Sequence, residues 1–548
     1  MNEPTRKLPD PTLDKDGCWH GQSCLSPEHF KVRGALAIPS THVIPVVFLP
    51  GTMGSNLKAT SKSRGLKPGQ AAWRPPNGKI EGGVEVWKWN RRDPVARQNI
   101  LDPDAVAVDD SGAVDIPLDW TINQSDTARE RGWGSVLWSS YGEFLFKLQT
   151  HLNRTFERMG ERRYILDHWQ KIMKAKRDKW DAADMPPLTE DDLLKHIKYQ
   201  YPVYAVGYNW LASNEAAAKT VQKRIEDIID WWNSRGHQCE HVIIVTHSMG
   251  GLVGRACAKA IPDKVLGVIH GVMPAIGTPL AYRRIACGVE DMSPSNSWLE
   301  NKAAGFFSDI AGRTSAESMP VMGVAPGVLE LLPNHRYPGK WLLASTRANQ
   351  QYEDVLQLPQ GDPYAMYRDF EPWYRLLDPA LCDPAKRYVR EEGGIEKKIT
   401  KAINQAERFH KQVIDEYYHP NTYAYYGEDA KHLSHGVVRW QIRRKREGLS
   451  EAQLKSGRLD SSTNTGGRNV WVDGFEGHWY FEPAQQEAKG DGTVSPESGA
   501  APKGKPGVKR VFKTTGYEHQ DSYQDESMVQ LTKYLIVKMV AEKVKAKA

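Results

Sequence analysis

The sequence predicts an α/β protein in which helices cover a mostly parallel sheet. Between residues 201 and 273, strand-like apolar segments alternate with helical ones in the order β-α-β-α-β, which is typical of a parallel sheet. A β-branched run at 241–246 leads straight into a helical segment at 252–260. The length of 548 residues is sufficient for one large sheet with long insertions.

The individual elements follow from composition and periodicity. Residues 44–49 predict an early buried strand, and 138–156 carry apolar residues at helical spacing. Further strands are predicted at 201–206, 264–273, 469–480 and 509–515, and further helices at 212–233 and 525–545. The predicted domains are an irregular N-terminal segment, 1–40; a first core part, 41–282, with a charged helical excursion at 157–199; a large helical cap or insertion, 283–465; and a second core part, 466–548.

Composition argues against several classes of function. The net charge is +6, from 73 basic and 67 acidic side chains mixed along the chain, without the basic block that a nucleic-acid-binding protein carries. No segment approaches the ~20 apolar residues that span a bilayer. Residues 1–50 lack the features of a secretory signal. We therefore expect a chain that is made in the cytoplasm as a soluble protein and is exported, if at all, by signal-independent machinery.

Ser248 lies at the most informative point of the sequence. The β-branched run at 241–246 meets residues 247–251 (HSMGG), and a helical segment follows. A strand, a sharp turn that carries a serine, and a helix together form the nucleophile elbow of the α/β-hydrolase fold. The turn lifts the hydroxyl clear of the sheet, and the helix N-terminus favours developing negative charge. We therefore predict an α/β-hydrolase fold and a protein that cleaves or transfers acyl groups.

The elbow departs from the usual G-x-S-x-G pattern at its first position, where Thr246 replaces glycine. The glycines of this pattern permit a strained turn and close packing of the helix on the strand. Gly250 and Gly251 provide space on the far side of the serine. The β-branched Thr246 must therefore be accommodated by a local adjustment.

A nucleophilic serine needs an imidazole to take its proton and a carboxylate to orient that imidazole. In α/β-hydrolases the acid follows the serine in the chain, and the histidine follows the acid. Asp491 lies in a glycine-flanked turn (GDGTV), and His519 follows the late strand within YEHQD. We predict Ser248 as the nucleophile, Asp491 as the orienting acid and His519 as the base.

Other late residues fit these roles less well. Asp473 lies in a strand-like stretch without a turn to present it, and Asp521 and Asp525 are too near His519 to come from a separate strand end. His478 precedes Asp491, which inverts the expected order.

An oxyanion hole needs two backbone N–H groups near the nucleophile. One donor should be Met249, the residue after the serine, and the other should come from the loop after an early strand. Thr52 follows Pro50 and Gly51 in that loop. We predict Thr52 and Met249 as the donors; an ordinary glycine turn is the alternative for the early loop.

Four motifs resemble the lecithin:cholesterol acyltransferase and lysosomal phospholipase branch of the α/β-hydrolases. They are FLPGTMGSNL at 48–57, YNW at 208–210, THSMGG at 246–251 and GDGTV at 490–494. Within that branch, the long interrupted cap and the EHQDS motif at 518–522 are most similar to bacterial lipase effectors of the type VI secretion system (Tle). The matches cover mainly 43–57, 201–281 and 485–535, so the cap contributes little to the resemblance.

The resemblance implies a phospholipase A-type enzyme that releases fatty acid from glycerophospholipids of a rival cell's membrane, as an antibacterial toxin. It maps the nucleophile to Ser248, the acid to Asp491, the base to His519, and the oxyanion donors to Thr52 and Met249. It also implies secretion without a signal peptide, action in the target-cell periplasm or membrane, a cognate immunity protein and a secretion-spike carrier.

Other functions share these residues. A neutral lipase or carboxylesterase would use the same triad, and a lipid acyltransferase would use an alcohol in place of water. A non-catalytic binding protein on a hydrolase scaffold predicts a broken triad, and no member of this triad is replaced. No cofactor is predicted. Acidic residues at 290–291 and 521–526 could bind calcium, but no motif supports a metal site, and solvated surface is the simpler interpretation.

Overall fold

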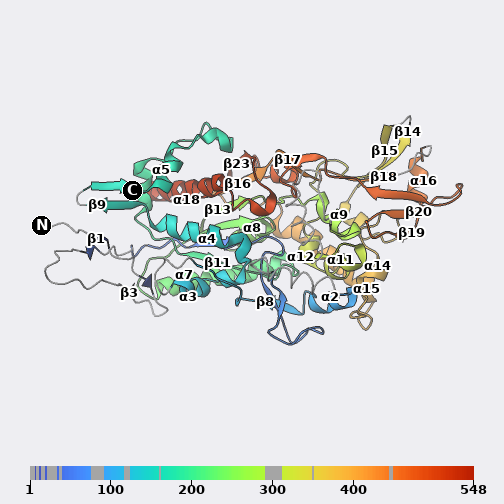
Figure 1. The fold of residues 1–548 in the computed structure, drawn as a ribbon, viewed down its shortest axis with the longest axis horizontal. Helices are drawn as coiled ribbons and strands as arrows, with labels where there is room; N and C mark the ends of the chain where they lie inside the picture. The colour runs from blue at the N-terminus through green and yellow to red at the C-terminus, as the bar shows by residue number, and fades with distance from the viewer. Residues whose placement is uncertain are drawn as a thin grey trace.

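A six-stranded sheet forms the centre of the fold (Figure 1). The computed structural model describes residues 40–75, 92–116, 124–159, 162–289, 311–348, 351–442 and 448–547, and four two-residue strands nearer the N-terminus. The strand order is β11–β5–β12–β13–β16–β23, and every neighbouring pair is parallel. The bounds are Val203–Ala205 (β11), Val46–Leu49 (β5), Val242–His247 (β12), Val265–Gly271 (β13), Thr422–Gly427 (β16) and Val508–Thr514 (β23).

The central strands are buried on both faces, which explains their continuous apolar runs. Every residue of β5 and β12 is buried. In the register of the sheet, Thr246 lies between Leu49 of β5 and His270 of β13. Because all six strands are parallel, their carboxyl ends meet at one edge, where ligand sites of α/β sheets form.

Helices cover both faces of this sheet, and the period-2 alternation of the strands assigns each face. One face packs against α7 (Asn214–Asn233) and α8 (Gly250–Ala260). The other face packs against α4 (Trp138–Asn153) and α18 (Glu526–Lys547). The predicted mostly parallel sheet covered by helices is therefore confirmed. Among the described residues, no helix is both long and apolar enough to cross a membrane.

A second six-stranded sheet lies toward the end of the molecule at the right of Figure 1. Its strand order is β15–β14–β18–β21–β20–β19, with one parallel pair, β14–β18, and otherwise antiparallel pairs. The bounds are Gln351–Leu358 (β15), Leu342–Ala348 (β14), Val438–Ile442 (β18), Trp479–Pro483 (β21), Arg468–Trp471 (β20) and Arg458–Ser462 (β19).

The two sheets correct the predicted domain boundaries. Thr422–Gly427 (β16) falls inside the predicted cap, 283–465, but pairs within the central sheet. Arg468–Trp471 (β20) and Trp479–Pro483 (β21) fall inside the predicted second core part, 466–548, but pair within the second sheet. The insertion therefore contains a sheet as well as helices. The local sequence of a strand does not predict which sheet it joins, because the strands with which it pairs are distant in sequence.

The charged excursion predicted as helical at 157–199 also contains strands. It starts with an antiparallel hairpin of β9 (Phe156–Met159) and β10 (Arg162–Ile165), and two α-helices follow, α5 (Asp167–Lys174) and α6 (Glu190–His196). Of the predicted irregular segment 1–40, the structure describes Ser40 and the short strands β1 (Arg6–Lys7), β2 (Thr12–Leu13), β3 (Trp19–His20) and β4 (Gly34–Ala35); the rest lies outside the described residues.

Shorter elements complete the described chain. Early strands are β6 (Leu57–Ala59), β7 (Ala71–Trp73) and β8 (Val106–Val108), and late ones are β17 (Asp429–Ser434) and β22 (Ala488–Gly490). Helices are α2 (Pro94–Ile100), α3 (Gln124–Glu130), α9 (Pro279–Cys287), α11 (Ser315–Met322), α12 (Pro326–Leu329), α13 (Pro363–Tyr367), α14 (Pro379–Cys382), α15 (Gly394–Arg408), α16 (Glu451–Ser456) and α17 (Pro496–Gly499). Single turns are η1 (Trp133–Ser135), η2 (Arg177–Trp180), η3 (Pro262–Lys264), the π-helical η4 (Phe409–Ile414) and η5 (His519–Asp521).

Gly254 accommodates the threonine at the first position of the elbow pattern. A Cβ atom added at Gly254 of α8 would lie 2.8 Å from Cγ2 of Thr246. The helix can therefore pack closely on the strand because Gly254, one turn after the last glycine of the G-x-S-x-G pattern, has no side chain. The hydroxyl of Thr246 is satisfied by the ring Nδ1 of His270, at 2.9 Å.

We expect Gly254→Ala to lower the free energy of unfolding by about 1–3 kcal/mol, because the new methyl overpacks against Thr246. Thr246→Ser removes Cγ2 but keeps the hydroxyl. The double variant should therefore lose less stability than the two single variants added together. Urea denaturation of all four proteins measures this coupling, and strict additivity would refute the contact.

Candidate active site

Ser248 occupies a strained position between β12 and α8. Its φ is 51°, in the left-handed region that costs a non-glycine residue about 1–3 kcal/mol. Hydrogen bonds hold it on both sides: its N–H donates to the carbonyl of Gly271 at 2.9 Å, and its carbonyl accepts the N–H of Gly251 at 2.8 Å. The serine side chain is thereby fixed at the carboxyl edge of the sheet and at the start of a helix.

The structure brings Ser248, His519 and Asp491 together in one hydrogen-bonded chain. The Oγ of Ser248 lies 2.8 Å from Nε2 of His519, and Nδ1 of the same ring lies 2.8 Å from Oδ2 of Asp491. Asp491 is fully buried, and Ser248 and His519 are 8% and 7% exposed. This is the geometry in which an imidazole can remove the serine proton while a carboxylate fixes its tautomer.

A tight turn orients the carboxylate of Asp491. Its Oδ1 accepts the backbone N–H groups of Thr493 at 3.0 Å and Val494 at 2.7 Å, so only Oδ2 is left for the imidazole. Gly492 has a φ of 88°, which explains the glycine after the acid. The N–H of His519 also donates to the carbonyl of Asp491 at 2.7 Å. The main chain therefore joins the loops of Asp491 and His519.

Two of the alternative residues considered from the sequence, Asp473 and His478, pair with other side chains. The carboxylate of Asp473 accepts a hydrogen bond from Arg458 at 2.9 Å, and both side chains are exposed. The Nε2 of His478 lies 3.4 Å from a carboxylate oxygen of Asp460, and both of these side chains are also exposed.

The loop after β5 folds against the elbow. The N–H of Gly54 donates to the carbonyl of Gly51 at 3.0 Å, which closes a β-turn with Thr52 and Met53 at its centre. A Cβ atom at Gly51 would lie 3.0 Å from Cβ of Ser248, so a glycine is required for this approach. The hydroxyl of Thr52 lies 3.1 Å from the sulfur of Met249.

The predicted oxyanion donors are therefore neighbours. Within the described residues, no protein group accepts the backbone N–H of Thr52 or of Met249. An oxyanion hole needs two such donors, and here one belongs to the residue after Ser248 and the other to the loop that packs against Ser248.

Sequence reasoning missed two residues under the elbow, Tyr141 and His247. The Tyr141 hydroxyl lies 2.9 Å from Nδ1 of His247, and Nε2 of His247 lies 3.0 Å from the carbonyl of His519. The sequence placed His247 in the elbow motif and Tyr141 at an apolar position of a predicted helix, but it assigned neither a role. They are 106 residues apart, so no local pattern links them.

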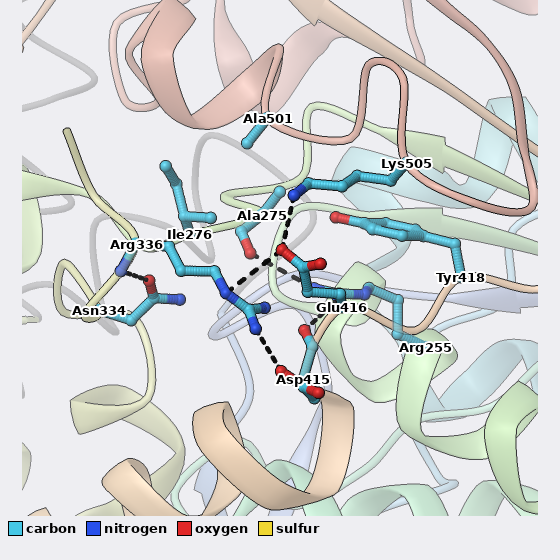
Figure 2. Close-up of a pocket in the computed structure, with 10 residues that line it drawn as sticks. All are labelled: Arg255, Ala275, Ile276, Asn334, Arg336, Asp415, Glu416, Tyr418, Ala501 and Lys505. Atoms are coloured by element: carbon cyan, nitrogen blue, oxygen red, sulfur yellow. Dashed lines mark hydrogen bonds and ion pairs between the residues drawn. The ribbon is translucent and has the colours of Figure 1, made fainter.

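A small hollow lies between α8 and the chain after η4 (Figure 2). Its volume is about 20 Å³, room for one water. Lys505 and Arg336 face the carboxylates of Glu416 and Asp415, with 2.6 Å between Lys505 Nζ and Glu416. Arg255 of α8 donates to three backbone carbonyls. A space of this size does not admit an acyl chain. The contacts of Arg255 with the chain after η4 fasten α8 to the insertion.

In the part of the chain that the structure describes, no three His, Cys, Asp or Glu side chains are grouped as a metal site requires. The acidic pair considered for calcium, Glu290 and Asp291, lies outside the described residues.

Buried histidines generate a pH dependence of stability. Burial, the largest cause, lowers the pKa of His247 and of His270 to about 3. In the unfolded chain these rings titrate near 6.5. As the pH falls below about 6.5, the unfolded chain binds protons that the native protein does not, so the free energy of unfolding must fall.

We expect a loss of about 1.4 kcal/mol per pH unit for each such histidine between pH ~6 and pH ~4. His270→Asn retains an acceptor toward Thr246 and should make this dependence shallower by about one proton. Urea midpoints measured from pH 7 to pH 4 provide the comparison with the unsubstituted protein. An identical slope in the two proteins would contradict the assignment of His270 as a buried neutral ring.

Comparison with known proteins agrees with the fold. The family model of the PGAP1-like alpha/beta domain matches residues 209–292, which contain the elbow. No curated protein matches the sequence significantly. A solved structure described as "The crystal structure of Tle4-Tli4 complex" contains a chain with 28% sequence identity and a TM-score of 0.74; the match covers 91% of this chain and 98% of that chain.

A second solved structure, phospholipase PlaB from Legionella pneumophila, has 11% identity and a TM-score of 0.15, with 66% of this chain and 91% of that chain covered. This similarity is too low to indicate a shared fold or function. The match to Tle4 and the domain match confirm both the predicted fold class and the predicted resemblance to Tle proteins. The chain is a hydrolase of the α/β-hydrolase fold that is similar to Tle4 over almost the full length of both chains.

Proposed function

We propose that this protein is a serine-dependent phospholipase of the A type that acts on membrane glycerophospholipids. The observation that carries the proposal is the hydrogen-bonded chain from Ser248 through His519 to Asp491, with the two unused N–H groups of Thr52 and Met249 beside it. The similarity to a Tle protein supports a lipase-type activity.

The reaction follows from the positions of the groups. Nε2 of His519 takes the proton of the Ser248 hydroxyl as its oxygen attacks the ester carbonyl. The N–H groups of Thr52 and Met249 bind the oxyanion. The leaving lysophospholipid alcohol then takes the proton from His519, which leaves an acyl group on the serine. Water, deprotonated by the same imidazole, releases the fatty acid and restores the enzyme. Asp491 keeps the Nδ1 proton on the ring throughout.

Ser248→Ala should reduce phospholipid hydrolysis by about 10³-fold or more, because the nucleophile is lost. Ser318→Ala is the matched control: this serine is buried too, and its hydroxyl donates to a helix carbonyl away from the triad. The assay uses vesicles of phospholipid with different acyl chains at the two ester positions, so the products also identify the position that is cut. Hydrolysis by Ser248→Ala at the rate of the control would refute the proposal.

The biological role follows as a second part of the proposal. We infer an antibacterial toxin that is delivered by type VI secretion on a spike carrier and acts on the target cell from the periplasm. The complex of Tle4 with Tli4 supports a cognate immunity partner of the Tli kind for this chain as well. A neutral lipase, a carboxylesterase or an acyltransferase would share the triad, and the product analysis distinguishes them.

Expression in a Gram-negative host tests this role. With a periplasmic signal peptide attached, the chain should stop growth and release free fatty acid from the host phospholipids. The Ser248→Ala variant in the same compartment, and the active chain kept in the cytoplasm, should both permit growth. Equal growth of all three strains at matched expression would contradict a periplasmic toxin, while leaving the esterase activity in vitro intact.

A further inference from the structure

A buried chain of hydrogen bonds connects the loop after β5 to the base of the triad. The N–H of Gly51 lies 3.2 Å from the Tyr141 hydroxyl, which lies 2.9 Å from Nδ1 of His247. Nε2 of His247 lies 3.0 Å from the carbonyl of His519. Tyr141 and His247 are 0% and 1% exposed, so water does not compete for these bonds.

The chemistry of the groups fixes the direction of every bond. A carbonyl can only accept, so Nε2 of His247 carries a proton and donates to His519. Burial lowers the pKa of His247 to about 3, so its ring is neutral and its Nδ1 is an acceptor. The Tyr141 hydroxyl therefore donates to Nδ1, and its oxygen accepts the N–H of Gly51. Donors and acceptors alternate without conflict along the chain.

The Tyr141 hydroxyl also fills the inside of the turn that presents Thr52. A Cβ atom at Gly54 would lie 2.8 Å from this hydroxyl, and one at Gly51 would lie 2.8 Å from Nδ1 of His247. The turn is therefore wrapped around the two side chains, with no space for any larger residue at either end. Both side chains are therefore in direct contact with the turn.

We propose that Tyr141 and His247 are positioning residues that set the oxyanion loop and the base His519 at a fixed distance from Ser248. The proposal rests on the proposed function, because it assigns these residues a role in that same reaction. Neither side chain forms a hydrogen bond with Ser248 Oγ. Neutral His247 keeps its Nε2 proton and transfers none to the reacting atoms. Their effect is on geometry: an error of about 1 Å in such a site can cost 10²-fold in rate.

The chain contains a matched control for these two residues. The Tyr364 hydroxyl lies 2.8 Å from Nδ1 of His410, whose Nε2 lies 2.8 Å from the carbonyl of Glu330. Both side chains are buried, and burial lowers the pKa of His410 to about 4. This second tyrosine–histidine–carbonyl group has the same bonds but joins elements of the insertion, and it has no hydrogen bond to the triad.

Tyr141→Phe and Tyr364→Phe therefore remove the same hydroxyl from the same type of buried group. We expect similar losses in Tm for the two variants. On a soluble chromogenic ester, Tyr141→Phe should lower kcat by about 10–100-fold with KM changed by less than about threefold. Tyr364→Phe should leave both constants unchanged. Equal kcat in the two variants would overturn the proposal, since a merely structural role predicts that result.

Substitutions at His247 provide the second measurement, including the case in which Tyr141→Phe does not fold. Gln at this position can still donate from its amide nitrogen to the carbonyl of His519, whereas Leu cannot. His247→Gln should therefore retain about tenfold more kcat than His247→Leu, at similar Tm. Equal kcat in the two would overturn the proposal.

Ser248→Ala separates this inference from the proposed function. If Ser248→Ala is inactive but Tyr141→Phe matches the control, only the positioning role fails. If Ser248→Ala hydrolyses the ester at full rate, the proposed function itself fails.

Discussion

The site depends on one backbone constraint, the left-handed conformation of Ser248 where β12 ends and α8 begins. A serine does not hold this conformation unless the surroundings impose it. Two backbone hydrogen bonds impose it here. One joins Ser248 to Gly271 of the neighbouring parallel strand, and the other joins it to Gly251 in the first turn of the helix. The glycines around the elbow exist because strand, helix and loop must all approach this one residue closely.

Burial of polar groups is the second constraint, and it decides how the site is held. An unpaired buried donor or acceptor is costly, so partners for the side chains of Asp491 and His247 lower the free energy of the folded site. Asp491 binds its own turn with one oxygen and His519 with the other, while His247 bonds at both ring nitrogens. The same interactions that satisfy the interior therefore fix the positions of Asp491 and His519 beside Ser248.

The insertion explains why distant parts of the chain meet at this edge. The chain leaves the central sheet after β13, builds helices and a second sheet, and returns to the centre for β16 and β23. Between those two returns it forms most of the second sheet, and the turn of Asp491 precedes β23. Arg255 donates to carbonyls of the returning segment and so fastens α8 to this junction (Figure 2).

The sequence by itself determined the fold class, the elbow and the order serine, acid, histidine, because each depends on local patterns: a β-branched run before HSMGG, and a carboxylate between two glycines. It did not determine the sheet to which β16, β20 and β21 belong, since strand pairing is a long-range choice. Nor did it reveal that Gly254 makes room for Thr246, or that Tyr141 lies against His247. Those are contacts between segments that only the packed chain brings together, so the tertiary structure alone decided them.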